Sequence, residues 1–182
     1  MIIGPYVPFF DINDVVLHVN VKAGEMHREW TKCGLISNFI ASYVTLSCHS
    51  EKSILNSLSV ILNELIENAV KYYFTNSDDT INILVSRKGD DVFLKVKNRT
   101  NAANYEILQE AARDLIDPDK ANDKYFEKLR NIVPNQNSSG IGLLMIISFF
   151  KVQMSFQLQN IEGTELYDAS VQVKIDIKEL NQ

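Results

Sequence analysis

A carboxylate, an amide and an ammonium group occur at helical spacing in the middle of the chain. Glu64 and Asn68 are four positions apart, and Lys71 follows three positions later. At 3.6 residues per turn these side chains form one stripe on a helix. An asparagine oxygen suits Mg²⁺, a glutamate can take a proton from a hydroxyl or water, and a lysine can balance phosphate charge. The stripe therefore offers the parts that phosphoryl transfer needs. The same residues are also common on a solvated helix face, which is the interpretation that spacing alone favours.

Two glycines open a second candidate helix, in the segment 139–143, which reads Ser-Gly-Ile-Gly-Leu. Glycines at a helix start let the backbone approach an anion, and the free N–H groups at that end point toward it. The alternative interpretation is a tight turn from a loop into a helix. The segment is thus a candidate cradle for phosphate.

The surrounding elements follow from the spacing of the apolar residues. Period 3.6 predicts helices over 25–46, 53–74 and 138–150, and weaker ones near 105–116 and 121–132. Alternation predicts strands over 14–21, 80–87, 91–97, 152–160 and 168–177, with a hairpin turn at 88–91. This pattern predicts an α+β two-layer sandwich, with helices on one face of a mixed, mostly antiparallel sheet. The polar insertion over 98–138 is interpreted as a lid.

Composition excludes several classes of protein. The chain has 182 residues, a length typical of a single domain over 1–182, and only seven glycines. Their positions match neither G-x-G-x-x-G nor G-x-x-x-x-G-K-[ST], which excludes Rossmann and Walker A nucleotide sites. A net charge of −5 argues against a nucleic-acid partner. The longest apolar run, Ile141–Phe150, is too short to span a membrane. Two cysteines without metal-ligand spacing, and no signal peptide, lead us to expect a cytoplasmic protein.

The helix 63–72 resembles the N-box of the GHKL (Bergerat-fold, HATPase) ATPases and kinases, whose pattern is E-x-x-x-N-A-x-K-Y. The segment 139–143 resembles their G2 box, and the segment 163–166 resembles a late G-T element. The order of these motifs also fits, and the resemblance covers about residues 50–177. It implies a Bergerat ATP-binding fold with ATP and Mg²⁺ as cofactors, and it makes the insertion over 98–138 an ATP lid.

The resemblance assigns a role to each matching residue. Asn68 becomes the Mg²⁺ ligand, Glu64 the general base, and Lys71 a phosphate contact. The residues that close the lid end over the phosphates are Gly140, Ile141, Gly142 and Leu143.

The adenine end departs from the family pattern. The G1 box, D-x-G-x-G, is replaced by the segment 96–101, with Asn98 in place of the aspartate and no glycine. An asparagine oxygen can still accept a hydrogen bond from the adenine amino group, and Thr164 of the G-T element supports adenine recognition. The same departure resembles the SiaB-type branch of the family, whose members act as Ser/Thr kinases on a small regulatory protein and are opposed by a PP2C-type phosphatase.

Three functions remain open on the sequence. The first is an ATP- and Mg²⁺-dependent Ser/Thr protein kinase of the anti-sigma-factor or SiaB type. Its substrate would be a small regulatory protein, and a PP2C-type phosphatase would oppose it. A homodimer is one assembly that such a kinase could form. The second is a weak or inactive GHKL-like module that sequesters a regulator, which the altered G1 segment motivates. In the third, the motifs are coincidental features of a structural α+β domain.

Overall fold

Six strands form one sheet in the computed structural model, with the spatial order β1-β5-β6-β4-β3-β2. The structure describes residues 1–6, 15–47, 52–75, 80–131 and 140–181. The strands are β1 (Ile2–Ile3), β2 (Val15–Lys22), β3 (Thr80–Lys88), β4 (Asp91–Asn101), β5 (Gln153–Asn160) and β6 (Leu166–Asp176). The helices are α1 (Ala23–Arg28), α2 (Thr31–Ser47), α3 (Lys52–Lys71), α4 (Ala102–Leu115), α5 (Pro118–Arg130), α6 (Gly142–Phe150) and the 3₁₀ turn η2 (Glu179–Asn181).

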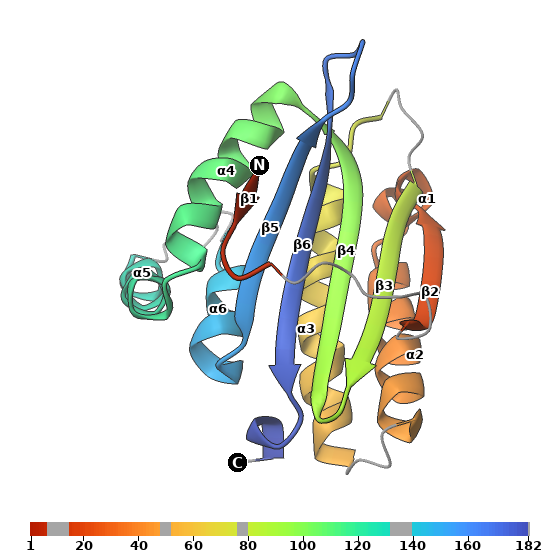
Figure 1. Ribbon diagram of the computed structural model, residues 1–182, viewed down its shortest axis with the longest axis vertical. Coiled ribbons are helices and arrows are strands. Elements are labelled where there is room, and N and C mark those ends of the chain that lie inside the picture. The colour runs from red at the N-terminus through yellow and green to blue at the C-terminus, as the bar shows by residue number, and fades with distance from the viewer. Residues whose placement is uncertain (7–14, 48–51, 76–79, 132–139, 182) are drawn as a thin grey trace.

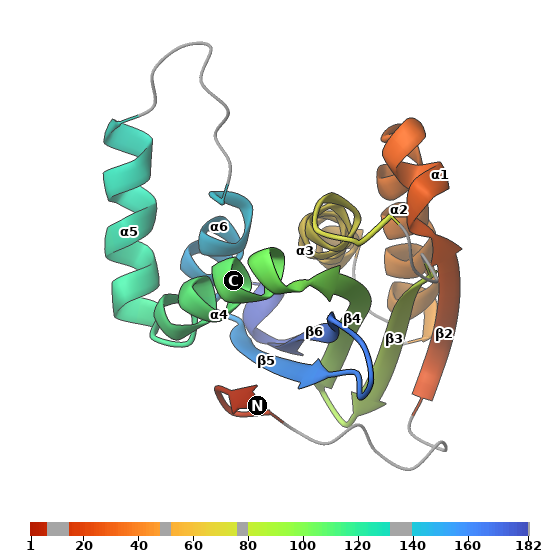
Figure 2. The same ribbon diagram turned by 90° about the horizontal axis from the view of Figure 1, so that it is seen from above.

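The helices lie on one side of the sheet, so the predicted α+β two-layer sandwich is confirmed (Figures 1 and 2). Helix α3 runs across the middle of the helical layer, with α1 and α2 at one end and α4, α5 and α6 at the other (Figure 2). Every strand pair among the described residues is antiparallel. The described part of the chain therefore lacks the parallel pair that a mixed sheet implies.

Helix α3 forms because its apolar residues recur at helical spacing. Those residues face the sheet and are at most 7 % exposed: Ile54, Leu58, Ile61, Leu62, Leu65, Ile66, Ala69 and Val70. Beside this apolar arc, Glu64 and Asn68 are half-buried and Lys71 is exposed. The core thus fixes which way the polar stripe of α3 faces, toward the gap between α3 and the helices α4 and α6.

The turn between β3 and β4 lies where the hairpin was predicted, and Gly89 adopts the positive φ of 64° that such a turn requires. Strand β4 then continues four residues past the predicted end and pairs with β6 along its whole length. Within this extension Asn98 lies opposite Ala169. The first residues of the insertion over 98–138 are therefore strand, and they are held in the middle of the sheet.

The rest of the described insertion is helical, as the sequence predicted. Helix α4 begins at Asn101, whose side chain accepts a hydrogen bond from the backbone N–H of Asn104. Helix α5 is capped in the same way by Asp117, with Pro118 at its first turn. Residues 132–139, which include Ser139 of the G2-like segment and the end of the predicted lid, lie outside the described residues.

Further boundaries differ from the sequence prediction, among them the start of α6, which is Gly142 where the expected helix covered 138–150. The single helix expected over 25–46 is divided into α1 and α2, because Glu29 leaves the helical conformation at φ −135° and ψ 84°. The strand β1 was not predicted; its two residues are too few to show a period. Among the described residues, no helix is both long and apolar enough to cross a membrane.

Candidate functional site

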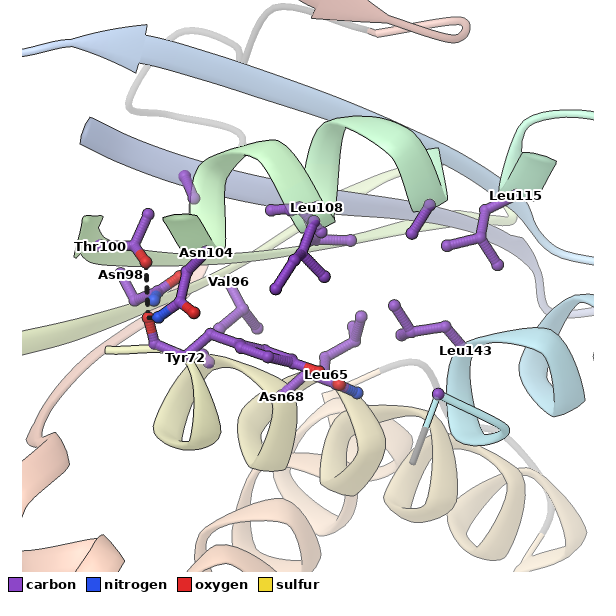
Figure 3. Close-up of a pocket in the computed structure, with 16 residues that line it drawn as sticks. Leu65, Asn68, Tyr72, Val96, Asn98, Thr100, Asn104, Leu108, Leu115 and Leu143 are labelled. Carbon is purple, nitrogen blue, oxygen red and sulfur yellow. Dashed lines mark hydrogen bonds between the residues drawn. The ribbon is translucent and has the colours of Figure 1, made fainter. Parts of the chain in front are cut away.

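A pocket lies between the polar stripe of α3, the inner face of β4 and β6, and helix α4 (Figure 3). Its volume is about 90 Å³, which holds a few water molecules but is smaller than the roughly 300–1,000 Å³ typical of small-molecule pockets. The apolar residues that line it are Leu65, Ala69, Val96, Ile107, Leu108, Ala111, Leu115, Leu143, Ala169 and Val171. Helix α4 supplies four of these, so the position of α4 sets the size of the cavity.

The end of the pocket near the start of α4 is polar. Thr100 is only 1 % exposed, and its Oγ1 donates a hydrogen bond to the carbonyl oxygen of Tyr72 at 2.7 Å. Asn104 Nδ2 donates to the same carbonyl at 3.3 Å. These bonds join β4 and α4 to the end of the long helix, and they hold the start of α4 over the pocket.

Asn98 lies beside Thr100 at this end of the pocket (Figure 3). Its side chain is 8 % exposed, and its Nδ2 has no hydrogen-bond partner within the described part of the chain. An unsatisfied buried donor costs about 1–3 kcal/mol. An amide in this state is suited to a ligand that brings its own acceptor.

Asn68 lies between the two ends of the pocket (Figure 3). Its Nδ2 donates to the carbonyl oxygen of Glu64 on the same helix at 2.6 Å. Because the Nδ2 group makes this bond, Oδ1 is the atom that can accept a hydrogen bond from a ligand in the pocket or coordinate a metal ion there. The role of Asn68 as an oxygen ligand of Mg²⁺ stays a prediction.

Glu64 lies one turn before Asn68 and against the start of α6. A Cβ placed on Gly142 would lie 1.7 Å from Glu64 Oε2, so the carboxylate occupies the space that any larger residue at 142 would take. Burial raises the pKa of the Glu64 carboxyl, and the Glu67 carboxylate raises it further. A glutamate whose pKa moves toward neutrality is better suited to general base catalysis.

The other end of the pocket is formed by Gly140 and Leu143. Gly140 adopts a φ of 81°, a backbone conformation that favours glycine. Its carbonyl oxygen accepts a hydrogen bond from Lys128 Nζ of α5 at 3.3 Å. Helix α6 begins here, and no side chain caps its first turn. The positive end of the helix dipole is therefore not offset by a capping side chain. Two positive features, the lysine and the helix start, meet at this end.

Five residues that the resemblance selected do not line this pocket. Two of them, Glu64 and Gly142, lie against each other next to it. Lys71 is exposed, and its Nζ lies 5.3 Å from the centre of the Tyr72 ring. Ile141 is half-buried at the start of α6. Thr164 is exposed in the turn between β5 and β6, where its hydroxyl donates to the Ile161 carbonyl oxygen at 2.8 Å and accepts from the Leu166 N–H at 3.2 Å. Its bonding capacity is used within that turn.

The sequence reasoning missed Thr100, Asn104, Tyr72 and Lys128. A signal for Thr100 exists, since the alternation of β4 continues from Val96 through 98 and 100, with Lys97 and Arg99 between these positions on the opposite face. The two residues on helices of the insertion, Asn104 and Lys128, carry no such signal. They reach the site only because α4 and α5 fold back over α3 and α6.

The comparisons with known proteins support the fold. No protein-family model matches the chain, and a search of curated proteins finds no match. Among solved structures, a chain of the SiaB–SiaC complex from Pseudomonas aeruginosa matches with a TM-score of 0.64 and 15 % sequence identity, over 92 % of this chain and 99 % of that chain. The likeness therefore extends over nearly the whole of both chains.

Proposed function

We propose that this chain is an ATP- and Mg²⁺-dependent protein kinase of the GHKL pattern, which phosphorylates a serine or threonine of a small regulatory protein. The observation that carries the proposal is the order of groups along one pocket. A buried amide with an unused donor lies at one end, an amide oxygen in the middle, and a glycine-opened helix with a lysine at the other. A nucleotide presents a base, then phosphates with their metal, in the same order.

An asparagine at position 98 is chemically suited to bind adenine. An aspartate can only accept hydrogen bonds, whereas an amide accepts through Oδ1 and donates through Nδ2. Adenine offers both partners, an exocyclic amine and a neighbouring ring nitrogen, and asparagine pairs with adenine in this two-sided way in nucleic-acid recognition. The unpartnered Nδ2 of Asn98 would gain its acceptor from the base.

At the catalytic end each residue would have a separate role in phosphate transfer. Bound ATP would supply the phosphoryl group, and Mg²⁺ held by Asn68 Oδ1 would offset its charge. Glu64, with its raised pKa, would take the proton of the acceptor hydroxyl. Lys128 beside Gly140 would bring positive charge to the phosphates. Lys71 remains in the proposal as a residue that a movement of the lid could recruit.

The pocket would have to become larger before ATP could bind. A cavity of about 90 Å³ does not hold a nucleotide. Since α4 fills the space with Ile107, Leu108, Ala111 and Leu115, ATP binding would require α4 to move away from α3. The proposal therefore gives α4 and α5 the role of the lid.

The partners belong to the same proposal. The solved structure that this chain resembles is a complex of two proteins, and we extend that arrangement to a small regulatory protein as the substrate of this chain. A PP2C-type phosphatase would reverse the phosphorylation, and the system would operate in the cytoplasm. A homodimer is the assembly that we propose for the kinase.

A second function has a specific observation in its favour. Asn98 lies within a paired strand, where the GHKL pattern has a glycine-rich loop. A module that keeps the shell of the fold, but binds its regulator without turning over ATP, would need neither the loop nor a larger cavity.

Calorimetric titration with ATP and Mg²⁺ separates these functions. The kinase predicts heat with the wild-type chain, a loss of binding in Asn68→Ala, and normal binding in the control Asn56→Ala, an exposed asparagine on the same helix. No heat with the wild-type chain would exclude the kinase. Labelled ATP, incubated with the small proteins encoded beside this gene, then tests phosphate transfer. An unchanged transfer rate in Glu64→Ala would refute the assignment of the base.

A further inference from the structure

Strand β1 lies at the edge of the sheet, between β5 and helix α4 (Figure 1). Its two residues pair antiparallel with β5, and Ile2 lies opposite Gln157. The backbone N–H of Leu158 also donates a hydrogen bond to the carbonyl oxygen of Met1 at 2.9 Å. A strand of two residues makes few bonds to its neighbour, so it belongs to the parts of a fold that open most readily.

The segment around β1 also contacts α4 at two places. Near the middle of the helix, Gln109 Nε2 donates a hydrogen bond to Met1 Sδ at 3.3 Å. At the end of the helix, a Cβ placed on Gly4 would lie 2.8 Å from Ile116 Cγ2, and also 2.8 Å from the carbonyl oxygen of Met154. Gly4 adopts a φ of 87°, which favours glycine as well. The backbone at Gly4 is therefore packed tightly between the end of α4 and β5.

A third contact anchors the same segment on the face of the sheet that the helices do not cover. Tyr6 Oη donates a hydrogen bond to Gln157 Oε1 at 2.9 Å and accepts one from Lys95 Nζ at 2.8 Å. Because Lys95 precedes the inward-facing Val96 in β4, its side chain points away from the helices. Residues 1–6 thus extend from this outer face, around the edge of β5, to α4.

Helix α4 is the element that these contacts restrain. Its inward side chains fill the pocket between α3 and the sheet. The hydrogen bonds to the Tyr72 carbonyl oxygen hold the first turn of α4, whereas the contacts of Gln109 and Ile116 with residues 1–6 lie in its second half and at its end. In the proposed function α4 has to move away from α3 before ATP can bind. Residues 1–6 oppose that movement.

From these contacts we infer that residues 1–6 form a latch that holds α4 over the pocket. The latch acts through α4, because Gln109 and Ile116, the residues of α4 that it contacts, do not line the pocket. While the latch is closed, few chains have an open pocket, and the apparent affinity for ATP falls by that fraction. This effect on ATP rests on the proposed function, whereas the position of α4 can be measured without a nucleotide.

Hydrogen exchange of the chain without nucleotide tests the latch with two variants that release it. Gly4→Ala places a methyl group where Ile116 and the Met154 carbonyl oxygen lie, so β1 has to leave its place. Tyr6→Phe removes both hydrogen bonds of the hydroxyl but keeps the ring. Exchange of the α4 amides should become faster, by roughly tenfold in Gly4→Ala and about threefold in Tyr6→Phe, while exchange in α2 stays the same. Tyr43→Phe, the same change at an exposed tyrosine of α2, is the matched control and should alter neither.

A disulfide tests the opposite direction. Ile2 and Gln157 are partners on neighbouring strands, and facing positions of this kind are close enough for a disulfide. In the double variant Ile2→Cys with Gln157→Cys, oxidation fixes β1 on β5. Exchange in α4 should be slower in the oxidised form than in the reduced form of the same variant. The bond from Tyr6 to Gln157 is absent in both forms, so their difference reports the fixed strand alone.

Titration of the same variants with ATP and Mg²⁺ separates the latch from the proposed function. If both hold, Gly4→Ala binds ATP roughly tenfold more tightly than the wild type. Unchanged α4 exchange in Gly4→Ala overturns the latch, as does identical exchange in the oxidised and reduced double variant. Equal acceleration in α2 and α4 also overturns it, because the whole fold is then loosened. Faster exchange confined to α4, with no ATP binding in any variant, supports the latch and refutes the nucleotide site.

Discussion

The contact between Glu64 and Gly142 allows the candidate base to be displaced without removing it. In Gly142→Ala the new Cβ would lie 1.7 Å from Glu64 Oε2 and 2.6 Å from Glu64 Cδ. Since ordinary contacts between heavy atoms are about 3.5–4.0 Å, the carboxylate must move by ~2 Å. A shift of that size takes a catalytic group out of reach of its proton, so we expect phosphate transfer to fall by on the order of 100-fold.

The effect on stability separates this shift from simple unfolding. An alanine in place of glycine favours a helix by up to about 1 kcal/mol, whereas forcing a packed side chain aside costs about 1–3 kcal/mol. In the wild-type chain we therefore expect Gly142→Ala to lower the free energy of unfolding by about 0–3 kcal/mol. In a Glu64→Ala background the obstacle is gone, and the same change should be neutral or stabilising by up to about 1 kcal/mol.

A double-mutant cycle measured by urea unfolding gives the coupling between the two positions. The contact predicts a coupling energy of about 1–3 kcal/mol, together with retained ATP binding in Gly142→Ala. Gly163→Ala is the matched control, because Gly163 has open space around it; its strain comes from the backbone and should not depend on Glu64. A coupling energy near zero for Gly142 would refute the contact, and full transfer activity would refute the role of Glu64.

Three further predictions concern single side chains of the site. Glu64→Gln should be more stable than the wild type at neutral pH, because the raised pKa of Glu64 means that its ionisation disfavours the fold. The difference should vanish as pH falls below the ordinary value of 4.5, and a constant difference across that range in thermal unfolding would contradict the burial of the charge. Asn98→Leu replaces a buried amide whose Nδ2 has no partner among the described residues, so it should leave the free energy of unfolding unchanged or raise it by about 1 kcal/mol. It should also abolish ATP binding; tight ATP binding in this variant would show that Asn98 does not contact the base. Thr100→Val removes the hydrogen bond to Tyr72 and should cost about 1 kcal/mol in urea unfolding, with faster hydrogen exchange at the start of α4; unchanged exchange would show that this bond does not hold α4 in place.

Local spacing was sufficient to predict the elements and the face of each one. The polar stripe of α3 follows from the period of the helix, because the apolar residues that alternate with it have to face the core. The alternation of β3, β4, β5 and β6 follows in the same way from the two-residue period of a strand. The glycines before α6 also predicted a helix start, since glycine ends or opens elements through its own backbone freedom.

Contacts between distant segments could not be predicted from such windows. The approach of Glu64 to Gly142 joins residues 78 positions apart, and it depends on how α3 packs against α6. The extension of β4 to Asn101 is held by its pairing with β6 rather than by β propensity. That pairing places Asn98, the first residue of the expected insertion, in a buried strand.

The pocket shows the same division. Asn68 and Gly140 were found from sequence because each belongs to a motif with a local spacing. Thr164 also belongs to a motif with a local spacing, the G-T element, yet its hydroxyl makes its hydrogen bonds within its own turn. The sequence alone thus determined which residues could do chemistry, since residue type and helical or strand period are local properties. Only the tertiary structure decided which of them share one pocket, because strand register and helix packing depend on side chains far apart in the chain.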